Sequence, residues 1–142
     1  MDALDKDIIA CLTSDARMSV AVMARRLNVA RSTVQARLER LETNGTIAGY
    51  TLRLNTAMEE TRIRATILLS VEPRAQAAVL TRLRAIPQIR AAHTTSGRFD
   101  MLLRVSADTT AALDGVLDQI GDMPGVKSSE SLIHLSTKIA RQ

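Results

Sequence analysis

Five arginines lie close together in the sequence, between residues 25 and 40. A guanidinium group binds phosphate oxygens and the edge of guanine, so a group of arginines suits a polyanionic partner. One acid, Glu39, stands among them, which leaves this stretch with a net charge of +4. The arginines are Arg25, Arg26, Arg31, Arg37 and Arg40. Their function depends on the elements that position them.

Apolar residues in this part of the chain repeat at helical spacing. The pattern predicts a first helix around residues 4–12 and a second helix over residues 20–27, which begins after Ser19, a typical N-cap residue. Asn28 tolerates the left-handed backbone that ends a helix, and a break of only three residues, Asn28 to Ala30, precedes a third helix. Two helices joined by so short a turn are typical of a helix-turn-helix.

The third helix, which ends before Gly45, has the surface of a DNA-recognition helix. Its predicted inward stripe consists of Val34, Leu38 and Leu41. Short polar side chains near its start let the backbone approach base edges, while arginines further along reach guanine or phosphate. The predicted DNA-binding residues are Arg31, Ser32, Thr33, Gln35, Ala36, Arg37 and Arg40. A solvated arginine face or a protein-docking helical unit has the same spacing, so these alternatives stay open.

Beyond residue 61 the pattern changes to short apolar runs separated by helices. The predicted strands cover residues 64–71, 89–96, 101–106 and 126–139, and the predicted helices cover residues 75–86 and 109–123. Asp108 is the expected N-cap of the second of these helices. The order strand, helix, strand, strand, helix, strand is that of a ferredoxin-like βαββαβ sandwich.

The strands of this sandwich carry nearly continuous apolar runs, which predicts that both faces of the sheet are buried. Because two helices cover only one face, a second copy of the chain is the economical cover for the other. A dimer also holds two recognition helices about one DNA turn apart. We expect an α+β chain with a DNA-binding domain over residues 1–50, a linker over 51–61 and the sandwich over 62–142.

Composition disfavours several other functions. One phenylalanine and one tyrosine are too few to stack a row of single-stranded bases. With only His93, His134 and Cys11 as candidate ligands or nucleophiles, and no phosphate-binding loop, we expect no enzyme, no metal and no cofactor. Cys11 lies in an apolar run and is expected to be a buried structural thiol. No stretch approaches the roughly 20 apolar residues of a membrane helix, and no leader is visible, so we expect a cytoplasmic protein without a membrane partner.

Three stretches are typical of one known family. They are LDKDIIACLTSDAR from Leu4, the run that ends in GTIAGY at Tyr50, and the turn over residues 97–100, Gly-Arg-Phe-Asp, ahead of an apolar strand. Through them the whole chain resembles the leucine-responsive/asparagine-responsive (Lrp/AsnC) family of transcriptional regulators. The resemblance implies a winged helix-turn-helix domain, an amino-acid-sensing sandwich, and homodimers that assemble further, often into octamers.

The same resemblance implies an effector site around the Gly-x-x-Asp turn and the adjoining strand ends, where sandwiches of neighbouring dimers meet. The implied effector-binding residues are Thr94, Gly97, Arg98, Phe99, Asp100, Leu132, Ile133 and His134. A turn presents backbone N–H groups to an α-carboxylate, and Asp100 has the charge to accept hydrogen bonds from an α-ammonium group. A purely local role also stays open, in which Gly97 shapes the turn and Asp100 caps it.

Two positions depart from the family pattern. Ala30 stands where relatives commonly have a serine that caps the recognition helix, and Ser131 stands where threonine is frequent. We expect a sequence-specific DNA-binding transcriptional regulator that responds to an amino acid or a similar small metabolite. The alternatives are a nucleoid-associated, DNA-architectural protein without an effector and, because both histidines fall in predicted strands, a relative of a tetrapyrrole-binding decarboxylase.

Overall fold

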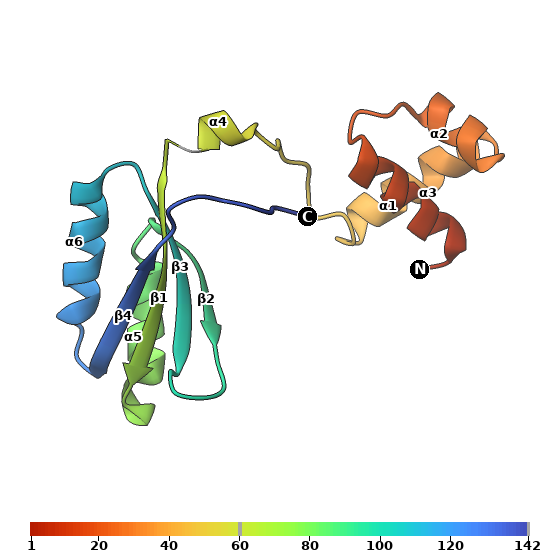
Figure 1. Cartoon of the computed structure of the whole chain (residues 1–142). Helices are drawn as coiled ribbons and strands as arrows, with labels where there is room; N and C mark the ends of the chain where they lie inside the picture. The colour runs from red at the N-terminus through yellow and green to blue at the C-terminus, as the bar shows by residue number, and fades with distance from the viewer. Residues whose placement is uncertain (60, 142) are drawn as a thin grey trace. The chain divides into compact units, whose positions relative to one another are not determined.

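The computed structural model describes residues 1–59 and 61–141, and their contacts divide the chain into two compact units, Met1–Arg53 and Leu54–Gln142 (Figure 1). Residue 60, in the expected linker, and residue 142, at the end of the expected sandwich, lie outside the described residues. The segment expected as a linker contains a one-turn helix, α4 (Thr56–Glu59).

The first unit is built from three helices, α1 (Ala3–Ser14), α2 (Val20–Leu27) and α3 (Arg31–Thr43). The Ser19 hydroxyl accepts a hydrogen bond from the Val22 N–H at 3.2 Å and so caps α2. Asn28 ends α2 in the left-handed region, with φ of 54°. The helix-turn-helix prediction is therefore confirmed. Its core consists of Ile8, Met23, Ala24, Val34 and Leu41, each at most 4% exposed, with the half-buried Cys11 packed against it.

The segment after α3 does not form the expected wing. Gly45 ends the helix region with φ of 79°, and the chain then runs without a strand over residues 46–55. Tyr50, Leu52 and Leu54 alternate as in a strand, and all three are exposed. A strand needs a neighbour for its backbone hydrogen bonds, and the first unit provides none. In the single chain, the winged form is thus corrected to three helices followed by an extended segment.

The second unit is a four-stranded sheet with helices on one side. Its strands β1 (Ile63–Val71), β2 (Ile89–Thr94), β3 (Met101–Ala107) and β4 (Val126–Ile133) lie in the order β2-β3-β1-β4, and all neighbours are antiparallel. A 3-10 turn, η1 (Pro73–Ala75), leads into α5 (Gln76–Arg84), and α6 (Thr110–Gly121) joins β3 to β4. This is the predicted ferredoxin-like arrangement.

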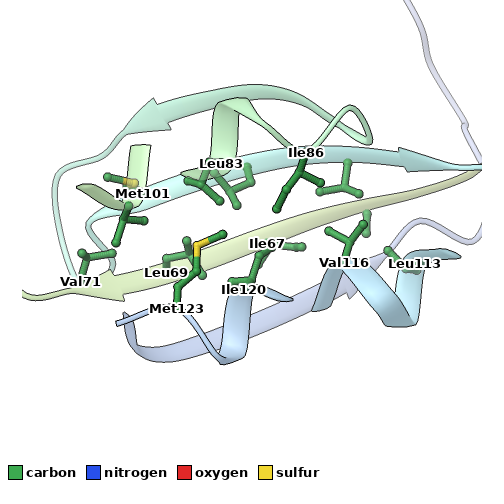
Figure 2. Close-up of a cluster of buried hydrophobic side chains, with 14 of the residues drawn as sticks. Ile67, Leu69, Val71, Leu83, Ile86, Met101, Leu113, Val116, Ile120 and Met123 are labelled. Atoms are coloured by element: carbon green, nitrogen blue, oxygen red, sulfur yellow. The ribbon is translucent and has the colours of Figure 1, made fainter. Parts of the chain in front are cut away.

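The core of the second unit lies between the sheet and its two helices (Figure 2). Ile67 and Leu69 of β1 point toward Val116 and Ile120 of α6, and Leu83 of α5 packs into the same cluster. Residues in β1 alternate between buried and half-buried, as expected for a strand with one covered face. The helices therefore hold the sheet from one side.

The other sheet face is less apolar than the runs that led to the prediction of two buried faces. The strand register places Thr66 between Arg104 and Leu132, and Leu68 lies next to Glu130. Charged side chains therefore interrupt the apolar ones on this face, which the runs of apolar letters in the sequence do not reveal. In the single chain this face is not buried, so its cover by a second copy stays a proposal.

Two element boundaries are corrected by the structure. Thr109, not Asp108, caps α6: its hydroxyl accepts from the Ala112 N–H at 3.0 Å, while Asp108 forms an ion pair with Arg62 at 3.2 Å. The last strand ends at Ile133 and not at residue 139. The His134 N–H still donates to the Arg64 carbonyl at 2.9 Å, but β1 begins at Ile63, so in this register it offers no residue opposite positions past 135.

Candidate functional site

The exposed surface of α3 contains most of the predicted DNA-binding residues. Arg31, Ser32, Gln35 and Ala36 are exposed, and Thr33 beside them is half-buried. Their spacing places the exposed four on one side of the helix, opposite the buried Val34 and Leu41. No side chain caps the start of α3 at Ala30. The first turn of α3 therefore presents short side chains and one arginine to solvent.

Arg37 and Arg40, also predicted to bind DNA, have partners within the first unit. Asp5 of α1 accepts from the Nη2 of Arg40 at 2.7 Å and from the Nη1 of Arg37 at 3.3 Å. Arg37 also donates to the carboxylate of Asp2. We call Asp2, Asp5, Arg37 and Arg40 the ion-pair cluster. It connects the start of α1 to the flank of α3.

The two aspartates of the ion-pair cluster also form the N-terminal cap of α1. Asp2 accepts from the Asp5 N–H at 3.0 Å, and Asp5 accepts from the Asp2 N–H at 3.2 Å, which makes a capping box. Asp5 is only 1% exposed and is the single charged residue that is buried in the part of the chain that the structure describes. Sequence reasoning missed these residues as partners of α3, since the spacing of two acids at a helix start indicates only a cap.

The arginines help to lower the pKa of both aspartates. The hydrogen bond from Arg37 is the main cause that lowers the pKa of Asp2, to about 2. Burial opposes the charged form of Asp5, but the backbone hydrogen bond at Asp2 and the two arginines outweigh it, so the pKa of Asp5 is lowered too. At neutral pH the ion-pair cluster thus contains two negative and two positive charges.

The Gly-x-x-Asp turn between β2 and β3 is held by main-chain contacts. Gly97 has φ of 105°, a backbone conformation that favours glycine. The Asp100 carboxylate accepts from the Val71 N–H at 2.8 Å, and the Asp100 N–H donates to the Leu69 carbonyl at 2.8 Å. The guanidinium of Arg98 lies 5.5 Å from the centre of the Phe99 ring. The Asp100 carboxylate therefore joins the turn to the end of β1, and one of its oxygens already accepts a hydrogen bond.

The two halves of the implied effector site lie at opposite ends of the sheet within one chain. Thr94 pairs with Met101, which pairs with Leu69 near the end of β1. Ile133 pairs with Ala65 near the start of β1. These two positions on β1 are about 13 Å apart along the strand, and β2 and β4 are opposite edges of the sheet. A single chain does not bring the two halves together.

The half at the end of β4 borders a groove of about 560 Å³. Ile133 and His134 line it together with Leu113 and Leu117 of α6. The His134 Nε2 is hydrogen-bonded to the Thr66 hydroxyl at 2.8 Å. In residues 1–59 and 61–141, no three histidine, cysteine or acidic side chains gather as a metal ion requires. The helices of that same part are all too short or too polar to cross a membrane.

Comparisons with known families decide the identity of this architecture. A family model described as the AsnC-type helix-turn-helix domain matches residues 1–42, and one described as the Lrp/AsnC ligand binding domain matches residues 64–142. The chain belongs to the Lrp/AsnC family. An uncharacterized HTH-type transcriptional regulator of Pyrococcus furiosus is 31% identical over 97% of this chain and 94% of its own length. The HTH-type transcriptional regulator FL11 of the same organism is 28% identical over 95% and 89%.

Solved structures of Lrp/AsnC proteins have the same fold. Escherichia coli AsnC superimposes with a TM-score of 0.88 over 100% of this chain and 97% of its own, at 24% identity. A transcriptional regulator of Neisseria meningitidis, solved as a complex with L-Met, superimposes with a TM-score of 0.85 over 99% and 93%, at 22% identity. Together with the family models and the curated relatives, this makes the Lrp/AsnC protein a transcriptional regulator that combines a helix-turn-helix domain with a ligand-binding domain.

Proposed function

We propose that this Lrp/AsnC protein binds duplex DNA through the exposed side of α3 and acts without catalysis, in the cytoplasm. The observation that carries the proposal is the exposed group Arg31, Ser32, Gln35 and Ala36, held outward by the buried side of the same helix. Such a surface suits base edges and phosphates in a major groove. Thr33 lies beside this surface, and Arg37 and Arg40 lie on its flank.

The effector in this proposal is an amino acid or a similar small metabolite. Two observations support it: the match of residues 64–142 to a ligand-binding domain, and the L-Met bound by the similar Neisseria meningitidis protein. The proposed contacts are those at the two ends of the sheet, Thr94, Gly97, Arg98, Phe99 and Asp100 from one chain with Leu132, Ile133 and His134 from another. Because one chain separates these groups, the proposal requires at least two chains. The assembly that we propose is a homodimer that assembles further to an octamer.

The regulatory mechanism in this proposal is thermodynamic linkage. An effector that binds between chains favours the assembly that forms its site. Each assembly places the recognition helices at a different spacing, so the affinity for a given DNA site changes with the assembly. The same coupling means that DNA binding changes the affinity for the effector by the same factor.

Two single substitutions on α3 test the DNA interface. Fluorescence anisotropy measures binding to a duplex that the wild-type chain selects from a random pool and to a shuffled duplex. We expect Arg31→Ala to weaken binding to both duplexes and to reduce the salt slope by about one for each helix bound, since a phosphate contact is lost. Gln35→Ala should weaken binding to the selected duplex alone. Arg74→Ala, an exposed arginine in the second unit, is the matched control.

The outcome of these measurements separates the possible functions. Equal affinity of wild type and both α3 variants would contradict the proposed interface. Footprinting extends the test: discrete protected sites support a local regulator, whereas phased protection of unrelated DNA supports the architectural alternative.

A thermal-shift screen against the twenty amino acids, with light scattering on each hit, tests the effector. A ligand that binds only the folded state raises the melting temperature. A hit that also changes the oligomer supports linkage, and a folded, DNA-binding protein without any hit contradicts the sensing role.

A further inference from the structure

The ion-pair cluster contains two of the seven side chains that the sequence predicts to bind DNA. Arg37 and Arg40 lie one turn apart on the flank of α3 that faces the start of α1. The side chain of Arg37 is 28% exposed and that of Arg40 is 55% exposed. Both arginines therefore remain within reach of solvent while bound to carboxylates.

The four groups of the ion-pair cluster carry no net charge at neutral pH, because two carboxylates face two guanidinium groups. Exposed arginines outside the cluster have no such compensation: Arg25, Arg26 and Arg31 form no ion pair within residues 1–59 and 61–141. Unpaired arginines thus lie on α2 and at the start of α3, whereas the charges of Arg37 and Arg40 are balanced within the ion-pair cluster.

A carboxylate that is already paired with arginine competes with a DNA phosphate for the same N–H donors. Asp5 is a strong competitor, because it is 1% exposed and would be left as an uncompensated buried charge if both arginines turned away. Asp2 is 53% exposed, so its pair with Arg37 is the more readily exchanged of the two contacts.

We propose that Asp2 and Asp5 are positioning residues of the DNA interface, which hold Arg37 and Arg40 away from the phosphate backbone and so favour base recognition over charge-driven binding. This inference rests on the proposed function of α3. Phosphate contacts provide affinity for any sequence, whereas base contacts distinguish sequences. If Arg37 and Arg40 do not contact phosphates, the affinity for any sequence falls, while the affinity that comes from base contacts is unchanged.

Asp2→Asn is the decisive variant. Asparagine is as good an N-cap as aspartate, so α1 keeps its start while Arg37 loses one of its two carboxylate partners. We expect tighter binding to a shuffled duplex, by up to about tenfold at 0.1 M salt, and a salt slope steeper by about one for each helix bound. The ratio of affinities for the selected and shuffled duplexes should fall.

Asp7→Asn is the matched control. Asp7 is an exposed residue of the same helix and has no ion pair among the described residues, so its replacement changes the net charge equally without touching the ion-pair cluster. A double-mutant comparison completes the design. In an Arg37→Ala background, Asp2→Asn should no longer change the salt slope, because the arginine through which Asp2 acts is gone.

Four results would overturn the inference: an unchanged salt slope in Asp2→Asn, weaker binding of this variant to both duplexes, the same effect from Asp7→Asn, or an effect of Asp2→Asn that persists without Arg37. A weaker binding would mean that the aspartates present the arginines to phosphate instead. Failure of the proposed function looks different, because the wild-type chain would then bind no duplex in a salt-dependent way. Circular dichroism and the melting temperature of each variant exclude a folding defect.

Discussion

The carboxylate of Asp100 accepts a hydrogen bond from the backbone N–H of Val71 at 2.8 Å. This contact joins the turn between β2 and β3 to the end of β1, across 29 residues of sequence. A residue that the family resemblance implies in effector binding therefore also fixes the local backbone. The two roles make different demands on the side chain. The Val71 N–H needs an acceptor oxygen, whereas the α-ammonium group of an effector needs a negative charge.

Substitutions at Asp100 separate the two roles. Asp100→Ala leaves the Val71 N–H without its acceptor, and we expect a loss of about 1 to 3 kcal/mol in the free energy of unfolding. Asp100→Asn keeps an acceptor oxygen and should retain most of that stability. Urea unfolding measures both variants. If Asp100→Asn is as stable as wild type and still gives the wild-type response to the amino-acid hit, the charge of Asp100 has no role in sensing.

Acid should destabilise the first unit through Asp2. Its pKa is about 2 in the folded chain, below its ordinary value of 3.8, so the unfolded chain binds the proton more readily. The contribution of Asp2 to the free energy of unfolding is therefore fully present above about pH 4 and is lost as the pH falls toward 2. Calorimetry at pH 7, 4 and 2.5 should show a smaller decrease in melting temperature for Asp2→Asn than for wild type. Asp7→Asn should follow wild type; equal curves for all three chains would refute this origin of acid sensitivity.

The uncapped start of α3 predicts a stabilising substitution. Ala30 is exposed and has φ of −69° and ψ of 148°, the extended backbone of an N-cap residue, but it has no side-chain acceptor. Ala30→Ser supplies one for the first turn and should raise the stability by about 1 kcal/mol. Chemical unfolding checks the change. Ala30→Val, which adds volume without an acceptor, is the control, and an equal gain from both would rule out capping as the cause.

Gly125 marks a close approach that no other residue fits. It has φ of 95°, and a Cβ at this position would lie 2.2 Å from the Cβ of Ala75. Gly125→Ala should therefore cost at least about 1 to 3 kcal/mol, through backbone strain alone and more through the clash. Gly115 of α6 is the counterpart, with open space around it. Gly115→Ala should stabilise the chain by about 0.5 to 1 kcal/mol. Parallel urea titrations should therefore show a lower free energy of unfolding for Gly125→Ala and a higher one for Gly115→Ala.

Features that depend on neighbours in sequence could be predicted well. The three helices of the first unit, the cap at Ser19 and the left-handed Asn28 follow from side chains within a few residues of each other. The order of strands and helices in the second unit follows from changes in apolar spacing. These signals are local, so the sequence displays them directly.

Features that depend on distant contacts could not be predicted. Asp5 and Arg40 are 35 residues apart, and only the packing of α1 against α3 brings them together. The length of β4 is limited by where β1 begins, and the polar character of the open sheet face depends on strand register. For the same reason, the predicted set of DNA-binding residues does not distinguish the unpaired Arg31 from the ion-paired Arg37 and Arg40.

The separation of Thr94 from Ile133 within one sheet has a consequence for how a response scales. A small molecule that touches both positions must be held by two chains, so its apparent affinity increases with the amount of protein present. In the proposed function, the abundance of the chain thus sets the threshold of the response. Any change in the expression of its own gene would retune that threshold without a single change in the binding residues.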